Sequence, residues 1–376
     1  MKEGWEYKKL GEVATFRRGL TYSKKDECNH STNIVLRSNN IDLDSGKLCF
    51  DKLKYLKEDF FIPNDKKVKR GCLLMCMSNG SKAHLGKVAL IDRDYGYAFG
   101  GFMSMVVPSS IIFGDYLFYN LGTLQYKAFI KSLSAGANIN NIKVRDLEKF
   151  SIPVPPLSEQ HRIVSYLDAA FAKINAVAKN AEDSLNEAKA LFQSALTKMM
   201  EPKEGWEERN MVKELALKSG DYLPSKVQTG GSIPVYGGNG IAGYHHESNI
   251  DSEHIIIGRV GALCGNVHLV RGKAWVTDNA FVATGISDNL WNKKFLLYEL
   301  ISMNLNSYAT KAAQPVISNK SLRDIRLFRP SLYVQDEVSR TLEKIEDKVS
   351  ILSSNLTRTL TECAALKQAI LRQTFE

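Results

Sequence analysis

Hydrogen-bonding side chains gather in loops that separate apolar, strand-like segments of the sequence. Arginine pairs well with guanine edges in the major groove of DNA, and asparagine or glutamine pairs with adenine edges. Side chains of these kinds in loops therefore predict contacts to the bases of a nucleic acid. The candidates are Arg37, Asn39, Asn40, Ser78, Asn79, Lys82, His84, Asn138 and Asn140 in the first half of the chain, and Tyr236, Asn239, His245, His246, Arg259, Asn279, Gln314 and Asn319 in the second.

Basic side chains accompany these loops. Lysine and arginine bind phosphates, which position a protein on nucleic acid without specifying the sequence that it binds. Any one such residue is more often ordinary solvated surface, so the prediction depends on the clusters recurring at corresponding places in the two halves. The candidate phosphate contacts are Arg17, Arg18, Lys24, Lys25, Lys69 and Arg70, all in the first half. Lys311 and Lys320 in the second half are further candidates for contact with DNA.

Residues that could catalyse a reaction or hold a metal lack the spacing that they would need. Cys72 and Cys76 are four residues apart in an apparent strand, about 13 Å by strand rise, which is too far to share a metal. The sequence Gly238-Asn239-Gly240-Ile241-Ala242-Gly243 fits the G-x-G-x-x-G pattern of dinucleotide-binding proteins, but no helical period follows it. We expect a glycine-rich surface loop there, and no active site, metal or cofactor in this chain.

Composition limits the class of protein. The chain has 376 residues, enough for two domains, and its hydrophobic content of 44% is typical of a globular protein. No apolar run approaches the ~20 residues of a membrane span, and the first residues show no secretion signal. The six cysteines are scattered, as in a reducing compartment. We therefore expect a cytoplasmic protein with no membrane association.

Net charge is unevenly distributed along the chain. Of the total of +9, residues 1–157 carry +8 and residues 205–330 carry +3, whereas residues 158–204 and 331–376 carry −1 each. Positive charge confined to particular segments suits a polyanionic partner such as nucleic acid.

The elements that must position these residues include two long helices, predicted at residues 157–200 and 331–376. Apolar or small residues alternate at steps of four and three, the pattern of a coiled-coil seam, and the second helix repeats the first at an offset of 175 residues. We expect the two helices to pack against each other in antiparallel fashion, the alternative being two core helices of separate domains. The seam positions are Ile163, Leu167, Ala170, Ile174, Val177, Ala181, Ala188, Leu191 and Ala195, matched by Val338, Leu342, Ile345, Val349, Leu352, Leu356, Cys363, Leu366 and Ile370.

The globular halves repeat as well. Gly4-Trp5-Glu6 recurs as Gly205-Trp206-Glu207, and each half continues with a short helix, several buried strands and an apolar helix, predicted over 116–129 and 295–303. Because strands and helices do not alternate regularly in either half, we predict an α+β fold with an internal pseudo-twofold repeat. The predicted parts are a first globular domain at 1–157, a helix at 158–204, a second globular domain at 205–330 and a helix at 331–376.

The sequence resembles the specificity subunits of type I restriction–modification systems over essentially its whole length. The resemblance is carried by the two Gly-Trp-Glu halves, by Ile152-Pro153-Val154-Pro155-Pro156-Leu157-Ser158-Glu159-Gln160 before the first helix, and by the segment 233–240. The second helix departs from it, because residues 332–336 keep only the glutamine, Gln335, of the Pro-Leu-Ser-Glu-Gln sequence.

The resemblance implies a non-enzymatic subunit in which each half recognises one part of a bipartite, asymmetric site in double-stranded DNA. It also implies that the helices fix the spacing between the two parts. The implied partners are two methyltransferase (M) subunits, which bind S-adenosylmethionine, and the restriction (R) motor–nuclease subunits. The alternatives are a coiled-coil scaffold that binds nucleic acid non-specifically, and a stand-alone enzyme.

Overall fold

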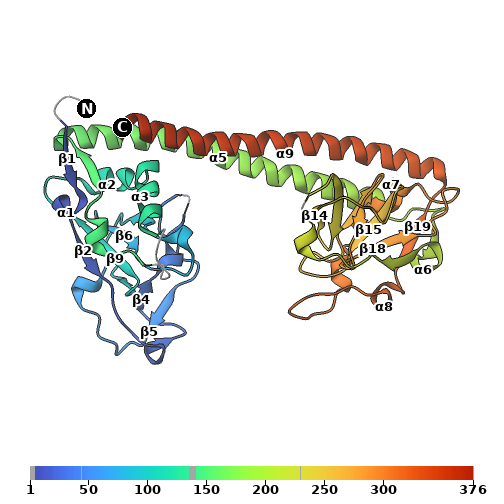
Figure 1. Ribbon diagram of the computed structural model, residues 1–376, viewed down its shortest axis with the longest axis horizontal. Helices are drawn as coiled ribbons and strands as arrows, with labels where there is room; N and C mark the ends of the chain where they lie inside the picture. The colour runs from blue at the N-terminus through green and yellow to red at the C-terminus, as the bar shows by residue number, and fades with distance from the viewer. Residues whose placement is uncertain (1–4, 44, 135–140, 229, 376) are drawn as a thin grey trace. The chain divides into compact units, whose positions relative to one another are not determined.

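The computed structural model describes residues 5–43, 45–134, 141–228 and 230–375. The chain divides into two compact units (Figure 1), one made of Met1–Asn180 and Arg358–Glu376, the other of Ala181–Thr357. Each unit combines sheets with helices, as the predicted α+β class requires. No helix in the described ranges is both long enough and apolar enough to cross a bilayer.

The first unit is built on a four-stranded sheet of order β2-β9-β6-β7. A smaller sheet, β3-β5-β4-β8, adjoins it, and a two-stranded sheet, β1-β10, joins the two ends of the globular part. The elements are β1 (Glu6–Lys9), α1 (Leu10–Val13), β2 (Ala14–Arg18), η1 (Lys24–Asp26), β3 (Glu27–Cys28), β4 (Asn33–Leu36), η2 (Ser38–Asn40), β5 (Lys54–Leu56), η3 (Asn64–Lys66), β6 (Leu73–Cys76), η4 (Lys82–His84), β7 (Val88–Leu90), β8 (Ala98–Phe99), β9 (Met103–Pro108), α2 (Gly114–Asn120), α3 (Leu124–Ser134), α4 (Val144–Leu147) and β10 (Ser151–Val154).

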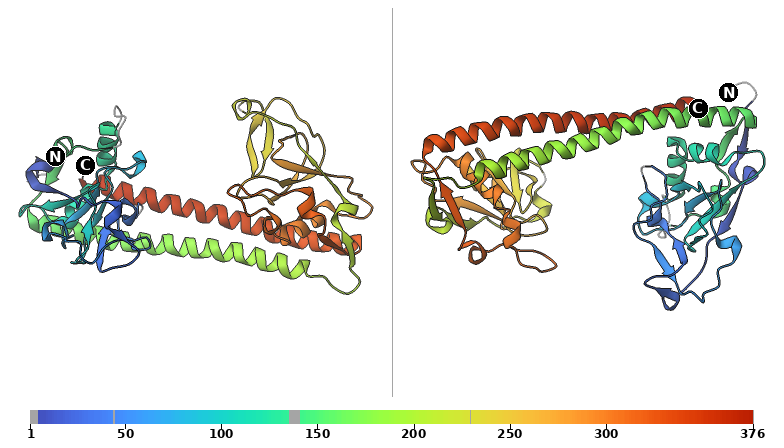
Figure 2. Two further views of the ribbon diagram at one scale, coloured as in Figure 1. Left: turned by 90° about the horizontal axis from the view of Figure 1, so that it is seen from below. Right: turned by 180° about the vertical axis from the view of Figure 1, so that it is seen from behind.

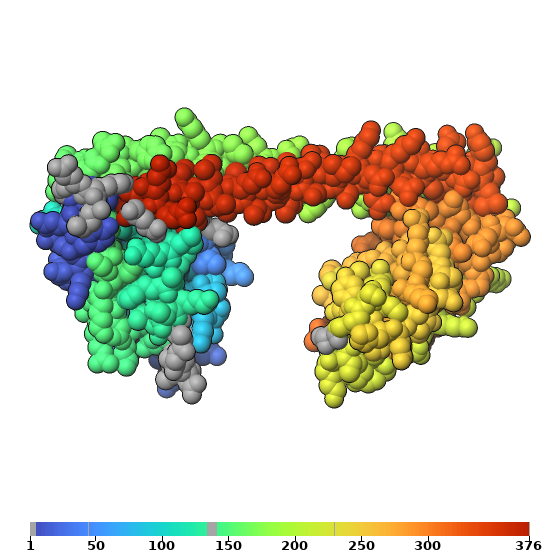
Figure 3. Space-filling model, turned by 45° about the horizontal axis from the view of Figure 1, so that its top comes forward, coloured from blue at the N-terminus to red at the C-terminus, as the bar shows by residue number. Residues whose placement is uncertain are grey.

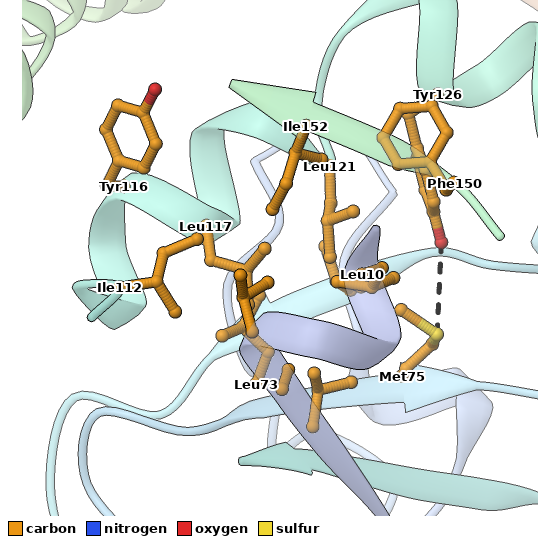
Figure 4. Close-up of a cluster of buried hydrophobic side chains, with 14 of the residues drawn as sticks. Leu10, Leu73, Met75, Ile112, Tyr116, Leu117, Leu121, Tyr126, Phe150 and Ile152 are labelled. Atoms are coloured by element: carbon orange, nitrogen blue, oxygen red, sulfur yellow. Dashed lines mark hydrogen bonds between the residues drawn. The ribbon is translucent and has the colours of Figure 1, made fainter. Parts of the chain in front are cut away.

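The core of this unit lies between the sheet β2-β9-β6-β7 and helices α1 to α3. Figure 4 shows Leu117 of α2 above Leu73 of β6 and Tyr126 of α3 above Met75 of β6, with Leu10 of α1 between the two pairs. The Tyr126 hydroxyl donates to the Gly86 carbonyl at 2.9 Å, so this buried polar group is satisfied. The core therefore fixes the sheet whose loops carry the polar candidates.

The second unit repeats the arrangement with sheet order β12-β18-β15-β16. Both units also contain one parallel pair, β4 with β8 in the first and β13 with β17 in the second. Its elements are β11 (Glu207–Asn210), α6 (Met211–Glu214), β12 (Ala216–Ser219), η5 (Ser225–Val227), β13 (Ile233–Gly237), β14 (Gly240–His245), β15 (His254–Gly258), β16 (Val267–Val270), β17 (Trp275–Val276), β18 (Ala280–Thr284), α7 (Lys293–Ser302), η6 (Leu305–Tyr308), α8 (Asn319–Leu322) and β19 (Arg326–Arg329).

Two long helices, α5 (Leu157–Met200) and α9 (Leu332–Phe375), confirm the predicted pair, each with 44 residues and no glycine or proline. In the first unit, Leu167 of α5 shares a buried cluster with Phe375 of α9. In the second, Leu196 of α5 shares one with Leu342 of α9. The start of each helix thus packs with the end of the other, so the pair is antiparallel (Figures 1 and 2). Figure 3 shows the start of α9 against the orange surface around α7.

Four predicted seam positions are exposed, so the heptad assignment is wrong there. Val177 and its counterpart Leu352 are 50% and 44% exposed, and Leu191 and its counterpart Leu366 are 62% and 51% exposed. An α-helix repeats every 3.6 residues and drifts away from a strict 3.5-residue pattern. In α5 the next residue in sequence is consequently the partly buried one, Ala178 after Val177 and Phe192 after Leu191. Each unit therefore exposes apolar side chains at predicted seam positions of both helices.

The glutamine kept in both helices is a structural residue. Gln160 is fully buried, its Oε1 accepts from the Phe113 amide at 2.7 Å, and its Nε2 donates to the Ile111 and Pro155 carbonyls at 2.9 Å each. Gln335 repeats these contacts with the Asn292 amide at 2.8 Å and with the Leu290 and Pro330 carbonyls at 2.9 Å. In each unit one side chain therefore ties the start of a long helix to the start of the apolar helix, α2 or α7.

Two local predictions require correction. The apolar helix predicted over 116–129 is two helices, α2 and α3, because the chain turns at Leu121–Thr123. The G-x-G-x-x-G segment is not a loop but a hairpin. Gly237 pairs with Gly240 across the two residues Gly238-Asn239, and the later glycine, Gly243, lies within β14. Gly240 has φ +90°, which suits a tight hairpin turn. The division into four parts at 157, 204 and 330 stays a prediction.

Candidate nucleic-acid interface

In the first unit, several sequence candidates meet at one end of the four-stranded sheet. Arg18 of β2 pairs with Ser104 of β9, and Cys76 of β6 pairs with Met103 of β9. The end of β2, the end of β6 and the start of β9 therefore lie together. Arg17 and Arg18 are exposed in β2, and Ser78 and Asn79 come two and three residues after the end of β6.

The turn after β4 joins this end. The Asn79 side chain donates to the Ser38 hydroxyl at 2.5 Å, across 41 residues of sequence. Arg37 is half-buried beside this turn, and Asn39 is exposed. The Lys66 ammonium donates to the Arg18 carbonyl at 2.9 Å, which adds a positive charge to the same end. We call the set of residues at this end the first polar edge: Arg17, Arg18, Arg37, Ser38, Asn39, Ser78, Asn79 and Phe102.

The structure places Asn40, one of the predicted base contacts, inside the protein. It is fully buried, its Oδ1 accepts from the Arg37 amide at 2.9 Å, and its Nδ2 donates to the Cys49 carbonyl at 2.9 Å. All its hydrogen bonds are made inside the protein, so it shapes the turn that carries Arg37 and Asn39.

The corresponding end of the second unit brings together Arg259, Ser219 and Asn279. The Arg259 amide donates to the Asn279 carbonyl at 2.8 Å, and the guanidinium Nη1 donates to the Ser219 hydroxyl at 3.2 Å. The guanidinium also lies 5.1 Å from the centroid of the Phe281 ring. The Arg259 Nε is buried without a hydrogen-bond partner. This arginine is thus held in place at the edge.

Two further segments reach the same end. The Asn266 side chain donates to the Asn239 side chain at 3.0 Å, at the tip of the β13–β14 hairpin. Val260 forms a bridge with Val316, which brings up the segment that contains Gln314 and Asn319. Among the residues of this segment, Lys311, Gln314, Asn319 and Lys320 are exposed. We call this set the second polar edge: Ser219, Asn239, Arg259, Asn266, Asn279, Gln314, Asn319 and Lys320.

Other candidates lie elsewhere. Lys69 and Arg70 precede β6 and so lie at the opposite end of the sheet, where the Arg70 amide donates to Asp94 Oδ1 at 2.9 Å. His245 and His246 lie at the open end of the β13–β14 hairpin, away from Asn239, because Ile233 pairs with His245.

The remaining candidates fall into three groups. Lys24 and Lys25 are exposed in η1 beside the smaller sheet, while Lys82 and His84 form η4 just after Asn79. Tyr236 is half-buried on β13 with its ring centroid 6.2 Å from that of His268. Asn138 and Asn140 lie outside the described residues.

A half-buried histidine, His268, lies beside the β13–β14 hairpin of the second unit. Burial lowers the pKa of His268, so this imidazole is uncharged at neutral pH. No group of three or more His, Cys, Asp or Glu side chains within the described part of the chain is arranged to hold a metal ion. What both edges offer is hydrogen bonding and positive charge.

Sequence reasoning missed Phe102, Ser219 and Asn266. Ser219 ends β12 as Arg18 ends β2, so the repeat itself offered a signal for it. Asn266 follows Gly265 in the turn before β16, again a repeated position. Phe102 gave no polar signal, because its side chain is apolar.

Comparisons with known proteins find similar sequences over most of the chain. The family model described as "Type I restriction modification DNA specificity domain" matches residues 2–187 and 203–362. The chain is 24% identical over its full length to the type I restriction enzyme StySPI specificity subunit of Salmonella potsdam, covering 89% of that protein. It is 33% identical to the EcoKI specificity subunit of Escherichia coli strain K12, over 46% of this chain and 38% of that one.

Solved structures share the fold. A chain from a study of "complex assembly and conformational transition of the type I R-M system" superimposes with a TM-score of 0.75 at 18% identity, covering all of this chain and 98% of that one. The crystal structure of the HsdS subunit from Thermoanaerobacter tengcongensis gives a TM-score of 0.50 at 20% identity, covering all of this chain and 97% of that one.

Proposed function

Because the chain belongs to the family of type I restriction–modification DNA specificity proteins, we propose that its two polar edges recognise the two parts of one bipartite DNA site. The observation that carries the proposal is the recurrence of the edge at the same end of the same sheet in both units. The first edge offers Arg37, Asn39 and Asn79, whereas the second offers Arg259, Asn279 and Gln314. Since the two sets differ, the two half-sites differ, and the whole site is asymmetric.

The flanking basic residues hold the DNA backbone. Arg17, Arg18 and Lys66 meet at the first edge, and Lys320 is exposed at the second. Contacts of this kind to phosphates supply affinity that falls with salt, but no sequence information.

The long helices dock the partner subunits in this proposal. Each unit exposes apolar residues on both long helices, among them Val177 and Leu366 in the first unit and Leu191 and Leu352 in the second. Exposed apolar side chains on a helix pair are typical of a protein interface. Two equivalent surfaces suit two methyltransferase subunits, through which the restriction subunits join. Leu191→Lys with Leu366→Lys should reduce co-purification of the methyltransferase and leave the helix content unchanged. Undiminished co-purification would contradict this docking.

The chain itself carries no catalytic group in this proposal. The methyltransferase subunits bind S-adenosylmethionine and transfer the methyl group, and this chain selects where they act. Methylation or cleavage of DNA by the purified single chain would contradict this assignment.

Footprinting tests the function directly. A DNase footprint of the chain with its methyltransferase subunits, on a site identified by methylome sequencing, should show two protected patches separated by an unprotected spacer. One continuous patch would contradict recognition by two edges. Binding that ignores sequence and disappears steeply with salt would support the alternative, a scaffold with non-specific affinity for nucleic acid.

A further inference from the structure

Phe102 is the most exposed apolar side chain at the first polar edge. Its ring is 73% exposed, although it directly precedes the buried strand β9. Its backbone is fixed, because the Phe102 carbonyl accepts from the Met77 amide at 2.9 Å and from the Ser78 amide at 3.2 Å. The next amide, of Met103, donates to the Gly100 carbonyl at 2.8 Å. A rigid turn thus holds a large apolar ring in solvent.

Hydrogen-bonding groups surround this turn. The Phe102 carbonyl is bound by Ser78, whose neighbour Asn79 donates to the Ser38 hydroxyl. On the other side of the turn, Gly100 lies close to Val35 and Arg37. A Cβ atom added to Gly100 would be 3.7 Å from a Val35 methyl and 3.8 Å from Arg37 Cγ. The ring is therefore an apolar contact placed among the side chains that form hydrogen bonds at this edge.

The second unit has an asparagine at the equivalent place. The Asn279 carbonyl accepts from the Arg259 amide, and the next strand, β18, begins at Ala280, as β9 begins at Met103 after Phe102. The same turn thus presents a ring in one unit and an amide in the other. An amide pairs with adenine, whereas an apolar side chain contacts the 5-methyl group of thymine, which only A·T pairs carry in the major groove.

Given DNA recognition by the polar edges, we propose that Phe102 is a specificity-determining residue whose ring packs on the 5-methyl group of a thymine in the first half-site. Burial of one methyl group against the ring accounts for about a fourfold difference in affinity between thymine and uracil. The hydrogen bonds of the turn fix the backbone of Phe102, so the ring starts from the same place at the edge in every complex.

The test uses the full chain in complex with its methyltransferase subunits and duplexes in which each thymine of the first half-site is replaced singly by deoxyuridine. The wild-type complex should lose about fourfold in affinity at one position. Phe102→Ala should bind the thymine duplex more weakly and show no difference between thymine and uracil there, and Phe102→Leu should restore part of the difference. Tyr7→Ala, which truncates an exposed aromatic residue of β1, is the matched control.

The outcomes separate this inference from the proposed function. If the wild-type complex binds its site specifically but Phe102→Ala keeps the same preference for thymine, the inference is overturned and DNA recognition stands. 2-Aminopurine placed in the first half-site becomes more fluorescent when its stacking on neighbouring bases is lost. An increase in its fluorescence that depends on Phe102 would also overturn the inference, because the ring would then enter the base stack. Loss of all sequence preference in the wild-type complex would instead remove the proposed function.

Discussion

Arg259 of the second polar edge is held in position by three contacts. Its backbone is bound to Asn279, its Nη1 is bound to Ser219, and the Phe281 ring lies beneath its guanidinium. An arginine whose rotamer is already set loses little side-chain entropy when it binds. Its free donors suit the O6 and N7 acceptors of a guanine.

Arg259→Ala is expected to cost about 1–3 kcal/mol of binding free energy and to relax the base preference at one position of the second half-site. Lys320→Ala should weaken binding to all sequences alike and lower the salt slope by about 1. Both effects are measured by titrating the complex with variant duplexes at several salt concentrations. Arg70→Ala, at the opposite end of the first sheet, is the control, and a comparable change in that variant would contradict the assignment.

Glu299 couples the stability of the second unit to pH. It is buried in α7, where Oε1 accepts from the Phe328 amide at 2.9 Å and Oε2 has no partner. Burial raises the pKa of Glu299 to about 7, above its ordinary value. The folded state therefore holds the proton more tightly than the unfolded state, and stability falls as pH rises from about 4.5 through 7.

Glu299→Gln should remove this dependence and make the protein more stable than wild type at pH 9, by about 3 kcal/mol at most. Urea unfolding between pH 4 and 9, followed by tryptophan fluorescence, measures it. Glu208→Gln, an exposed residue of β11, should leave the dependence unchanged. Parallel stability curves for wild type and Glu299→Gln would refute the coupling.

At the scale of elements, the buried glutamines decide how each long helix leaves its unit. Gln160 satisfies one amide and two carbonyls, and Gln335 satisfies the equivalent three. Leucine in their place leaves these groups without partners, and each unsatisfied buried group costs about 1–3 kcal/mol.

Gln160→Leu is therefore expected to destabilise the first unit by about 3 kcal/mol and to increase hydrogen exchange at the start of α5 and α2. Gln193→Leu, at an exposed position on the same helix, should change stability by less than about 0.5 kcal/mol. Urea denaturation and exchange mass spectrometry of the two variants provide the comparison. Equal stability of Gln160→Leu and wild type would show that the ties are dispensable.

Local periodicity explains why both long helices were predictable, whereas side-chain environments set by distant residues were not. Asn40 lies in a polar turn like its neighbour Asn39, but the carbonyls of Cys49 and Lys52 bury it. Lys69 and Arg70 resemble Arg17 and Arg18 in sequence, yet strand direction sends them to the other end of the sheet. The seam failed at Val177 and Leu191 because a 3.5-residue pattern is only an approximation to a real helix.

At the scale of the whole molecule, α5 and α9 each belong to both units, with the division at Asn180 in one helix and at Thr357 in the other. Neither helix is interrupted there, so the length of each helix is set by residues of both units. If this length sets the spacing of the two half-sites, changing it in both helices together should change the site.

Insertion of one heptad after Asn180 and another after Thr357 should lengthen the preferred spacer by about three base pairs, because seven residues add about 10 Å of helix and DNA rises about 3.4 Å per base pair. Insertion after Asn180 alone should destabilise the helix pair by displacing its buried positions. Methylome sequencing of cells that carry each variant, together with thermal unfolding, measures both effects. Retention of the original spacer by the doubly extended protein would refute the relation.

The division of the chain into two units also affects the order in which the units fold. Leu371 and Phe375 belong to the core of the first unit, where the Phe375 ring lies 5.3 Å from the ring of Tyr116, some 260 positions earlier. The second unit is one uninterrupted stretch, so on the ribosome it can fold completely while the first still lacks part of its interior. The half that is translated first is consequently the last to mature, and contacts of such long range make its final step slow.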